Sequence, residues 1–210
     1  ESRFDKKKEI GSRTNFHLTL LAKNKQGYHN LCKLSSIGYL EGFYYHPRID
    51  EEALKKYSEG LICLSGCLSS RVAYEALYGT PESLKGLIHR YRALFGEDYY
   101  LELQRHRMSD EDLHHDGLYQ ESWLLQQYQD YIAKQEKVNA ALVEVSQEMG
   151  IKLVATNDSH YIERSDWHAH EILLNIQSGE PCEIWEKDSM GMPKFRVPNP
   201  KRRTYASHEC

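Results

Sequence analysis

Apolar stretches alternate with amphipathic stretches along most of the chain, and this alternation predicts a mixed α/β fold. Apolar positions recur at helical spacing in the segments between the apolar runs, for example at Leu31, Leu34 and Ile37. Four short runs are predicted strands: FHLTLLA (16–22), GLICLSG (60–66), YYLELQ (99–104) and KLVATND (152–158). Strands and helices in this order indicate a mainly parallel sheet with helices outside it.

Start and stop signals set the ends of the predicted helices. A short acidic helix begins at Asp50, and a second helix in PESLKGLIHRYRALFG (81–96) has a start signal and a glycine stop. A long helix ends in VEVSQEMG (143–150). The segment SDWHAHEILLNIQSG (165–179) opens with a serine suited to capping and closes with a glycine.

Two regions depart from this rhythm. Residues 107–134 are polar and aromatic without a clear strand, so we expect a surface excursion that leads into the long helix. Residues 180–210 contain several prolines and glycines, and we expect irregular chain that serves as a linker. The basic run 201–203 is expected to be a solvated tail that could contact DNA phosphates. Residues 1–179 are then the main domain.

Composition narrows the class of protein. The 210 residues are 40% hydrophobic and 28% charged, which is typical of a globular domain with a sizeable core. A net charge of −4 provides no general basic field for binding nucleic acid. Five cysteines without a CxxC pair favour a reducing cytoplasm, and no apolar run is long enough for a membrane helix.

Polar residues gather where the predicted strands end. Cys67 follows the second strand, residues 102–106 end the third, and Asp158 and His160 follow the fourth. The carboxyl ends of parallel strands meet at one edge, so these groups are expected to share a rim. Alternation along a strand would point Asp158 and His160 the same way. A carboxylate beside an imidazole suggests a metal site or a proton-transfer site.

Each of these residues also has a purely structural interpretation. A cysteine such as Cys67 after a buried strand often acts as a small apolar residue, and His17 could be a hydrogen-bonded core histidine. Asp158 could cap a turn or helix, and His160 could bind a backbone carbonyl. The only His-x-His pair, 168–170, lies on a predicted helix, where a two-residue step turns the rings about 200° apart. We therefore interpret that pair as structural.

Four stretches in fixed order carry a family resemblance: FHLTLLAKNKQGYHNLCKLSSIGYLEGFYYHPRID, YSEGLICLSGCLSS, FGEDYYLELQRH and LVATNDSHYIERSDWHAHEILLNIQSG. Over most of residues 2–179 the sequence closely resembles the PHP (polymerase and histidinol phosphatase) domains of bacterial replicative DNA polymerases, the DNA polymerase III alpha subunits. The resemblance implies an α/β fold, an incomplete distorted (β/α) barrel of the PHP type, with metal ions at its rim.

The resemblance also implies site residues. His17, Cys67, Asp158 and His160 fall on metal ligands of the family, whereas His106 matches a family histidine that we assign only to the rim. Imidazoles, a carboxylate and a thiolate suit zinc or manganese. In family members with an intact site, the resemblance implies that such metals support the hydrolysis of phosphate esters, and the activity proposed is that of a 3'-5' exonuclease. Magnesium serves a separate polymerase site.

Other parts of the family pattern do not occur in these 210 residues. The family's His-x-His pair, a following aspartate, a Thr-Asp-His and a glutamate are absent, as are the polymerase domains. We therefore expect a fragment of a replicative polymerase that is inactive by itself. DNA and other replicase subunits are the expected partners through the intact protein.

Three functions remain open from the sequence. The first is part of a DNA-directed DNA polymerase whose PHP domain has metal-dependent exonuclease chemistry. The second is an inactive structural or docking module of that polymerase. The third is a stand-alone phosphatase of the wider superfamily, which the motifs GYHNLCKLSS and GFYYHPRID disfavour.

Overall fold

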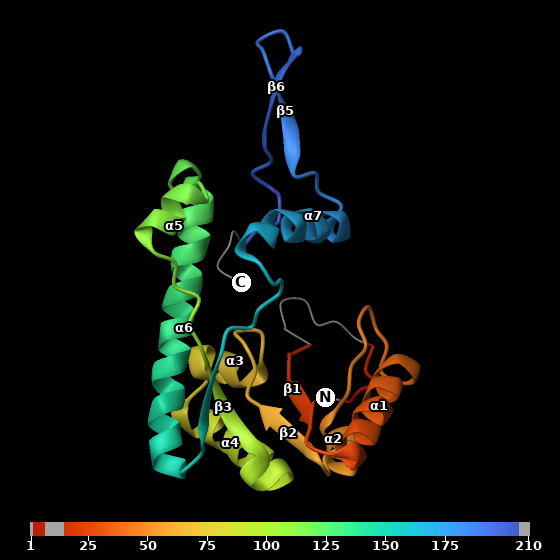
Figure 1. The fold of residues 1–210 in the computed structure, drawn as a ribbon. Coiled ribbons are helices and arrows are strands. Elements are labelled where there is room, and N and C mark those ends of the chain that lie inside the picture. Colours follow the sequence, from red (N-terminus) through yellow and green to blue (C-terminus); the bar gives the residue numbers. More distant parts are fainter. Residues whose placement is uncertain (1, 7–14, 206–210) are drawn as a thin grey trace. The chain divides into compact units, whose positions relative to one another are not determined.

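The chain forms two compact units in the computed structural model, which describes residues 2–6 and 15–205 (Figure 1). Unit 1 comprises Glu1–Leu103 and Lys134–Ala155, and unit 2 comprises Gln104–Ala133 and Thr156–Cys210. These divisions do not fall at the expected boundary at residue 179. How far the PHP domain extends along the chain stays a prediction.

One sheet takes all four predicted strands, in the order β1-β2-β3-β4: Thr19–Ala22, Leu61–Leu64, Tyr99–Gln104 and Leu153–Thr156. β2 and β3 are parallel, as expected. β1 runs antiparallel to β2, with Thr19 opposite Leu64, which differs from the expected direction. Hydrophobic alternation is the same for either direction of a strand, so the pattern could not reveal this.

β4 differs from the expectation of a buried run. Leu153 is 40% exposed and Ala155 is exposed as well. The reason is position: β4 lies at one edge of the sheet, where a strand has a neighbour on one side only. The fold class is nevertheless confirmed as α/β with helices around a sheet.

Two helices of unit 1 come between β1 and β2 in the sequence, α1 (Lys25–Leu40) and α2 (Glu51–Tyr57). Two more come between β2 and β3, α3 (Arg71–Tyr78) and α4 (Pro81–Phe95). Local capping explains their starts. The Asp50 side chain accepts from the Ala53 N–H at the start of α2, and Thr80 forms a capping box with Ser83 at the start of α4. Gly96 ends α4 with a positive φ of 57°.

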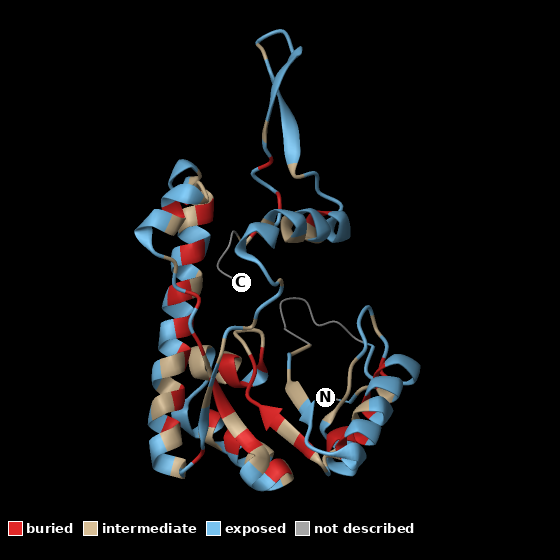
Figure 2. Cartoon of the chain, viewed as in Figure 1, coloured by how far each residue is buried: buried red, intermediate tan, exposed pale blue. Residues whose placement is uncertain are grey.

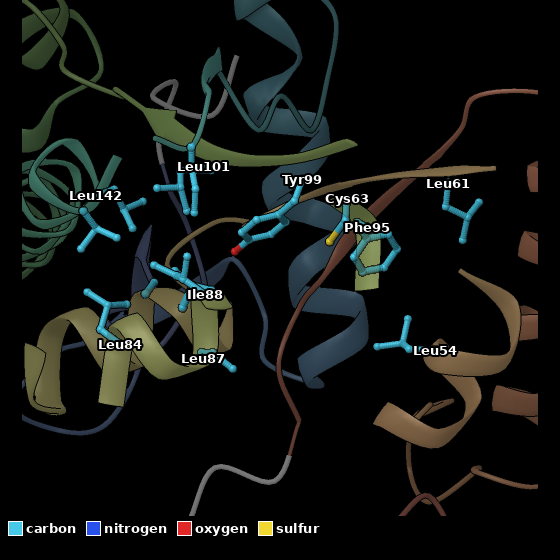
Figure 3. Packing of buried hydrophobic residues seen from close by; sticks show 14 of the residues in the cluster. Leu54, Leu61, Cys63, Leu84, Leu87, Ile88, Phe95, Tyr99, Leu101 and Leu142 are labelled. Atoms are coloured by element: carbon cyan, nitrogen blue, oxygen red, sulfur yellow. The ribbon is translucent and has the colours of Figure 1, made fainter. Parts of the chain in front are cut away.

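The core of unit 1 lies between its sheet and its helices. Tyr99 and Cys63 from adjacent strands point towards Ile88 and Phe95 of α4 in Figure 3. Cys63 is fully buried, and burial raises the pKa of its thiol, so it acts as a small apolar core residue. Figure 2 shows buried positions of this unit on β2 and β3 and on the helices, whereas β1 and β4 have none.

Unit 2 has a small core of its own. Residues 107–134 form α5 (Asp110–His115), η2 (Leu118–Gln120) and the first part of α6 (Ser122–Met149). The excursion does lead into the long helix, but it is packed rather than merely superficial. Its core is a cluster of buried hydrophobic side chains: Leu113, Leu118, Leu124, Tyr128 and Ile132.

An ion pair connects α5 to the segment before α7 (Trp167–Ser178). Arg164, in η3 (Arg164–Asp166), forms an ion pair with Asp112, and this guanidinium holds the pKa of the Asp112 carboxyl at about 2. No side chain caps α7, so the capping role expected of the serine before it is wrong. The glycine after α7, Gly179, does end it in a left-handed conformation.

The region expected to be irregular contains a hairpin. β5 (Glu183–Lys187) pairs antiparallel with β6 (Pro193–Pro198), and the Asp188 carboxylate accepts from two N–H groups in the turn. Prolines at both ends of β6 suggested broken chain, but an edge strand tolerates proline because its outer N–H groups need no partner. Figure 2 shows this hairpin exposed almost throughout.

The basic run is not simply solvated. Arg202 is 8% exposed and donates to both carboxylate oxygens of Glu121, at 2.8 and 2.6 Å. It also lies 3.4 Å from a carboxylate oxygen of Glu171 on α7. Arg203 is exposed, and its backbone N–H is bound by Asn175. One arginine of the run is therefore a structural residue.

No helix within residues 2–6 and 15–205 is both long and apolar enough to cross a membrane.

Candidate metal centre

His17 and Cys67 lie side by side in unit 1. His17 forms an isolated parallel bridge with Ser70, and its backbone N–H donates to the Ser69 carbonyl at 3.0 Å. Cys67 is in the loop between β2 and α3. Its Sγ is 3.6 Å from Nδ1 of His17, with His17 exposed and Cys67 half-buried. The backbone pairing therefore brings two side chains from distant parts of the sequence together.

The spacing of these two donor atoms fits a zinc ion. Zinc bonds of about 2.3 Å to sulfur and about 2.0–2.1 Å to nitrogen, at a tetrahedral angle, place the two donors about 3.5–3.6 Å apart. The distance between Sγ and Nδ1 is 3.6 Å. An imidazole and a thiolate are also donors that zinc accepts. This pair fits two adjacent ligands of one ion.

A buried carboxylate supports the loop that carries Cys67. Glu102 is 6% exposed, and its Oε2 accepts from the Gly66 N–H at 3.0 Å. The Ser65 hydroxyl in turn accepts from the Glu102 N–H at 2.8 Å. Gly66 has a φ of 83°, a left-handed conformation that disfavours other residues. Glu102 was expected on the rim, and its carboxylate binds Gly66, the residue directly before Cys67.

Asp158 and His160 do not lie on a strand. β4 ends at Thr156, and Asp158 has a φ of 52°, in the left-handed region. The alternation argument for a shared direction is therefore wrong, because the extended backbone that it requires stops two residues earlier. The structure places both residues in a loop of unit 2.

His170 lies next to His160. Their ring centroids are 5.6 Å apart, and the ring of Tyr161 is 5.4 Å from that of His170. Burial, with smaller effects of His160 and Arg203, lowers the pKa of His170. His168 instead stacks on Trp167, with centroids 3.8 Å apart. The two histidines of the His-x-His pair thus have different neighbours, as their positions on a helix predict.

His106 is 4% exposed and has a partner at each ring nitrogen. Nδ1 is 2.9 Å from the Tyr131 hydroxyl, and Nε2 contacts the carbonyl oxygen of Asn157. Tyr131 was not predicted from the sequence as a partner of His106. The contact joins residues 25 positions apart, and the only signal was the aromatic character of residues 107–134.

Two of the four predicted ligands lie in each unit. His17 and Cys67 belong to unit 1, and Asp158 and His160 belong to unit 2. Among the residues that the structure describes, no group of three or more histidine, cysteine, aspartate or glutamate side chains could hold a metal ion. The role of all four residues as ligands stays a prediction.

Comparisons with known proteins show which domain family and which proteins this chain is similar to. Residues 3–106 match the PHP domain family. Almost its whole length is similar to proteins named DNA polymerase III subunit alpha. The relative from Chlamydia pneumoniae is 53% identical over 208 residues, which is 99% of the chain and 16% of the relative.

More distant organisms have the same kind of relative. DNA polymerase III subunit alpha from Deinococcus radiodurans is 42% identical over 80% of the chain, and that from Thermus aquaticus is 37% identical over 96%. The chain spans 11% and 15% of these two relatives. The predicted resemblance is confirmed.

Proposed function

We propose that this chain serves as the PHP region of a bacterial replicative DNA polymerase. The observation that carries the proposal is the similarity to DNA polymerase III alpha subunits over 99% of the chain. In this proposal the whole protein carries out DNA-directed DNA synthesis in the cytoplasm during DNA replication. Its partners are DNA and other replicase subunits, and magnesium serves its polymerase site.

Within that protein, His17 and Cys67 of unit 1 would hold zinc or manganese, and Asp158 and His160 of unit 2 would also serve as metal ligands. A divalent ion bound there supplies the positive charge that phosphodiester hydrolysis requires, the chemistry of a 3'-5' exonuclease. Cys67 binds as a thiolate, so its Sγ must lose its proton. His17 binds through a neutral ring, whose Nδ1 faces Cys67. Glu102 keeps its carboxylate on the Gly66 amide and holds the loop in place.

A second function is favoured by one observation. The described residues contain no cluster of three potential ligands, which supports a structural or docking module without catalysis. Similarity to polymerase subunits along almost the whole chain argues against the third possibility, a stand-alone phosphatase.

Metal content separates the first two functions. After dialysis against trace zinc and manganese, we expect elemental analysis to find close to one equivalent of metal in the chain. A variant with Asp158→Ala and His160→Ala should retain less metal than the wild-type chain, because it lacks two of the proposed ligands. A folded wild-type chain that retains no metal would favour the docking module.

A further inference from the structure

The ring of His106 has a defined protonation pattern. The Asn157 carbonyl oxygen can only accept a hydrogen bond, so Nε2 of His106 carries the proton and donates. Nδ1 then accepts from the Tyr131 hydroxyl, 2.9 Å away. His106 is 4% exposed, so both contacts are sheltered from water. Each ring nitrogen thus has a distinct task.

The carbonyl that His106 binds belongs to the loop of two predicted ligands. Asn157 directly precedes Asp158, whose φ of 52° lies in the left-handed region, which is uncommon for residues other than glycine but more accessible to aspartate than to most. Gln104, two residues before His106, donates to the hydroxyl of Thr156, the last residue of β4, at 3.4 Å. Gln104 at the end of β3 and His106 just after it therefore contact two consecutive residues, Thr156 and Asn157, where β4 ends and the loop begins.

We propose that His106 is a positioning residue that holds the loop of Asp158 and His160 in the conformation required for metal binding. The inference rests on the proposed function, since it assigns a supporting group to that metal site. Groups that orient ligands typically change metal affinity about 10- to 100-fold when they are removed. His106 itself is not a ligand, because both of its nitrogens already have partners.

Two conservative variants separate positioning from simple packing. In His106→Gln the amide nitrogen can replace Nε2 as the donor to Asn157, whereas in His106→Asn the shorter amide can replace only Nδ1 beside Tyr131. Each variant loses one hydrogen bond, so their melting temperatures should fall by similar amounts. Tyr131→Phe is a third variant that keeps the contact to Asn157.

The probe is Mn²⁺, followed by its broadening of the His160 ring signals in NMR spectra of the 210-residue chain. We expect His106→Asn to weaken Mn²⁺ binding about 10- to 100-fold, with His106→Gln and Tyr131→Phe within about threefold of wild type. Equal weakening in the Asn and Gln variants, or none in either, would overturn the positioning role.

A separate outcome concerns the metal site itself. If Mn²⁺ leaves the His160 signals of the wild-type chain unchanged, the proposed metal site is wrong, and ligand positioning is overturned with it. The backbone chemical shifts of Asp158 then report whether the loop is still held. If these chemical shifts change in His106→Asn but not in His106→Gln, His106 still holds the loop, and only the metal binding is wrong.

Discussion

Replacing Arg202 with methionine is expected to destabilise unit 2 by about 3–5 kcal/mol, the usual cost of removing one partner from a buried ion pair. The Arg202 side chain is 7% exposed and lies between Glu121, 23% exposed, and Glu171, 13% exposed. Methionine would leave two poorly hydrated carboxylates without their cation. The variant Lys201→Met removes an exposed cation from the same run and should change stability by less than about 0.5 kcal/mol.

Tryptophan fluorescence can report this change selectively. All three tryptophans, Trp123, Trp167 and Trp185, belong to unit 2. Urea titration of the tryptophan emission should therefore show an earlier transition in Arg202→Met. The same midpoint in this variant and in Lys201→Met would show that the ion pair contributes little.

The free energy of unfolding at acidic pH gives a second measurement on the Arg202→Met variant. The hydrogen bond from Arg202 lowers the pKa of the Glu121 carboxyl in the folded protein. A lowered folded pKa contributes stability that is present above the unfolded pKa of about 4.3 and is lost as pH falls through the folded value. Wild-type unit 2 should therefore lose stability below about pH 4, with a shallower loss in Arg202→Met.

Replacing Glu102 with alanine is expected to disturb both stability and the Cys67 loop. The Gly66 N–H would lose its acceptor in a buried position, which costs about 1–3 kcal/mol. Zinc affinity at His17 and Cys67 should fall about 10- to 100-fold, because the loop is then less well oriented. Competition with a zinc-binding dye measures the affinity, and thermal melting measures the stability.

Matched variants decide what Glu102 contributes. Glu102→Gln retains an oxygen that can accept from Gly66, so it should keep most of the zinc affinity. Glu97→Ala removes an exposed carboxylate before the same strand and should have little effect. If Glu102→Ala binds zinc as tightly as wild type, the loop does not depend on this carboxylate.

Local signals in the sequence predicted the elements that local interactions define. The strand 99–104 and the helix of residues 81–95 occur as predicted, because caps, a glycine stop and dense apolar residues specify them within a few positions. α3 was not predicted, since its eight residues make only about two turns and give little length in which a helical period can be recognised.

The candidate site could be predicted only in part, because its geometry depends on contacts between distant segments. The pairing of His17 with Ser70 brings an imidazole to Cys67 across 50 residues, which no periodicity encodes. The sequence identified the residue types at strand ends but not the left-handed turn at Asp158. The same holds for the support that His106 gives, which required the fold of residues 107–134.

The most direct test of the His17 and Cys67 pair is the absorption spectrum of the chain with Co²⁺ in place of zinc. A cobalt–thiolate bond gives an intense charge-transfer band. We predict this band in the wild-type chain and in Cys32→Ser, which removes an exposed cysteine, and its loss in Cys67→Ser. A band that persists without Cys67, or a folded wild-type chain without one, would contradict the account.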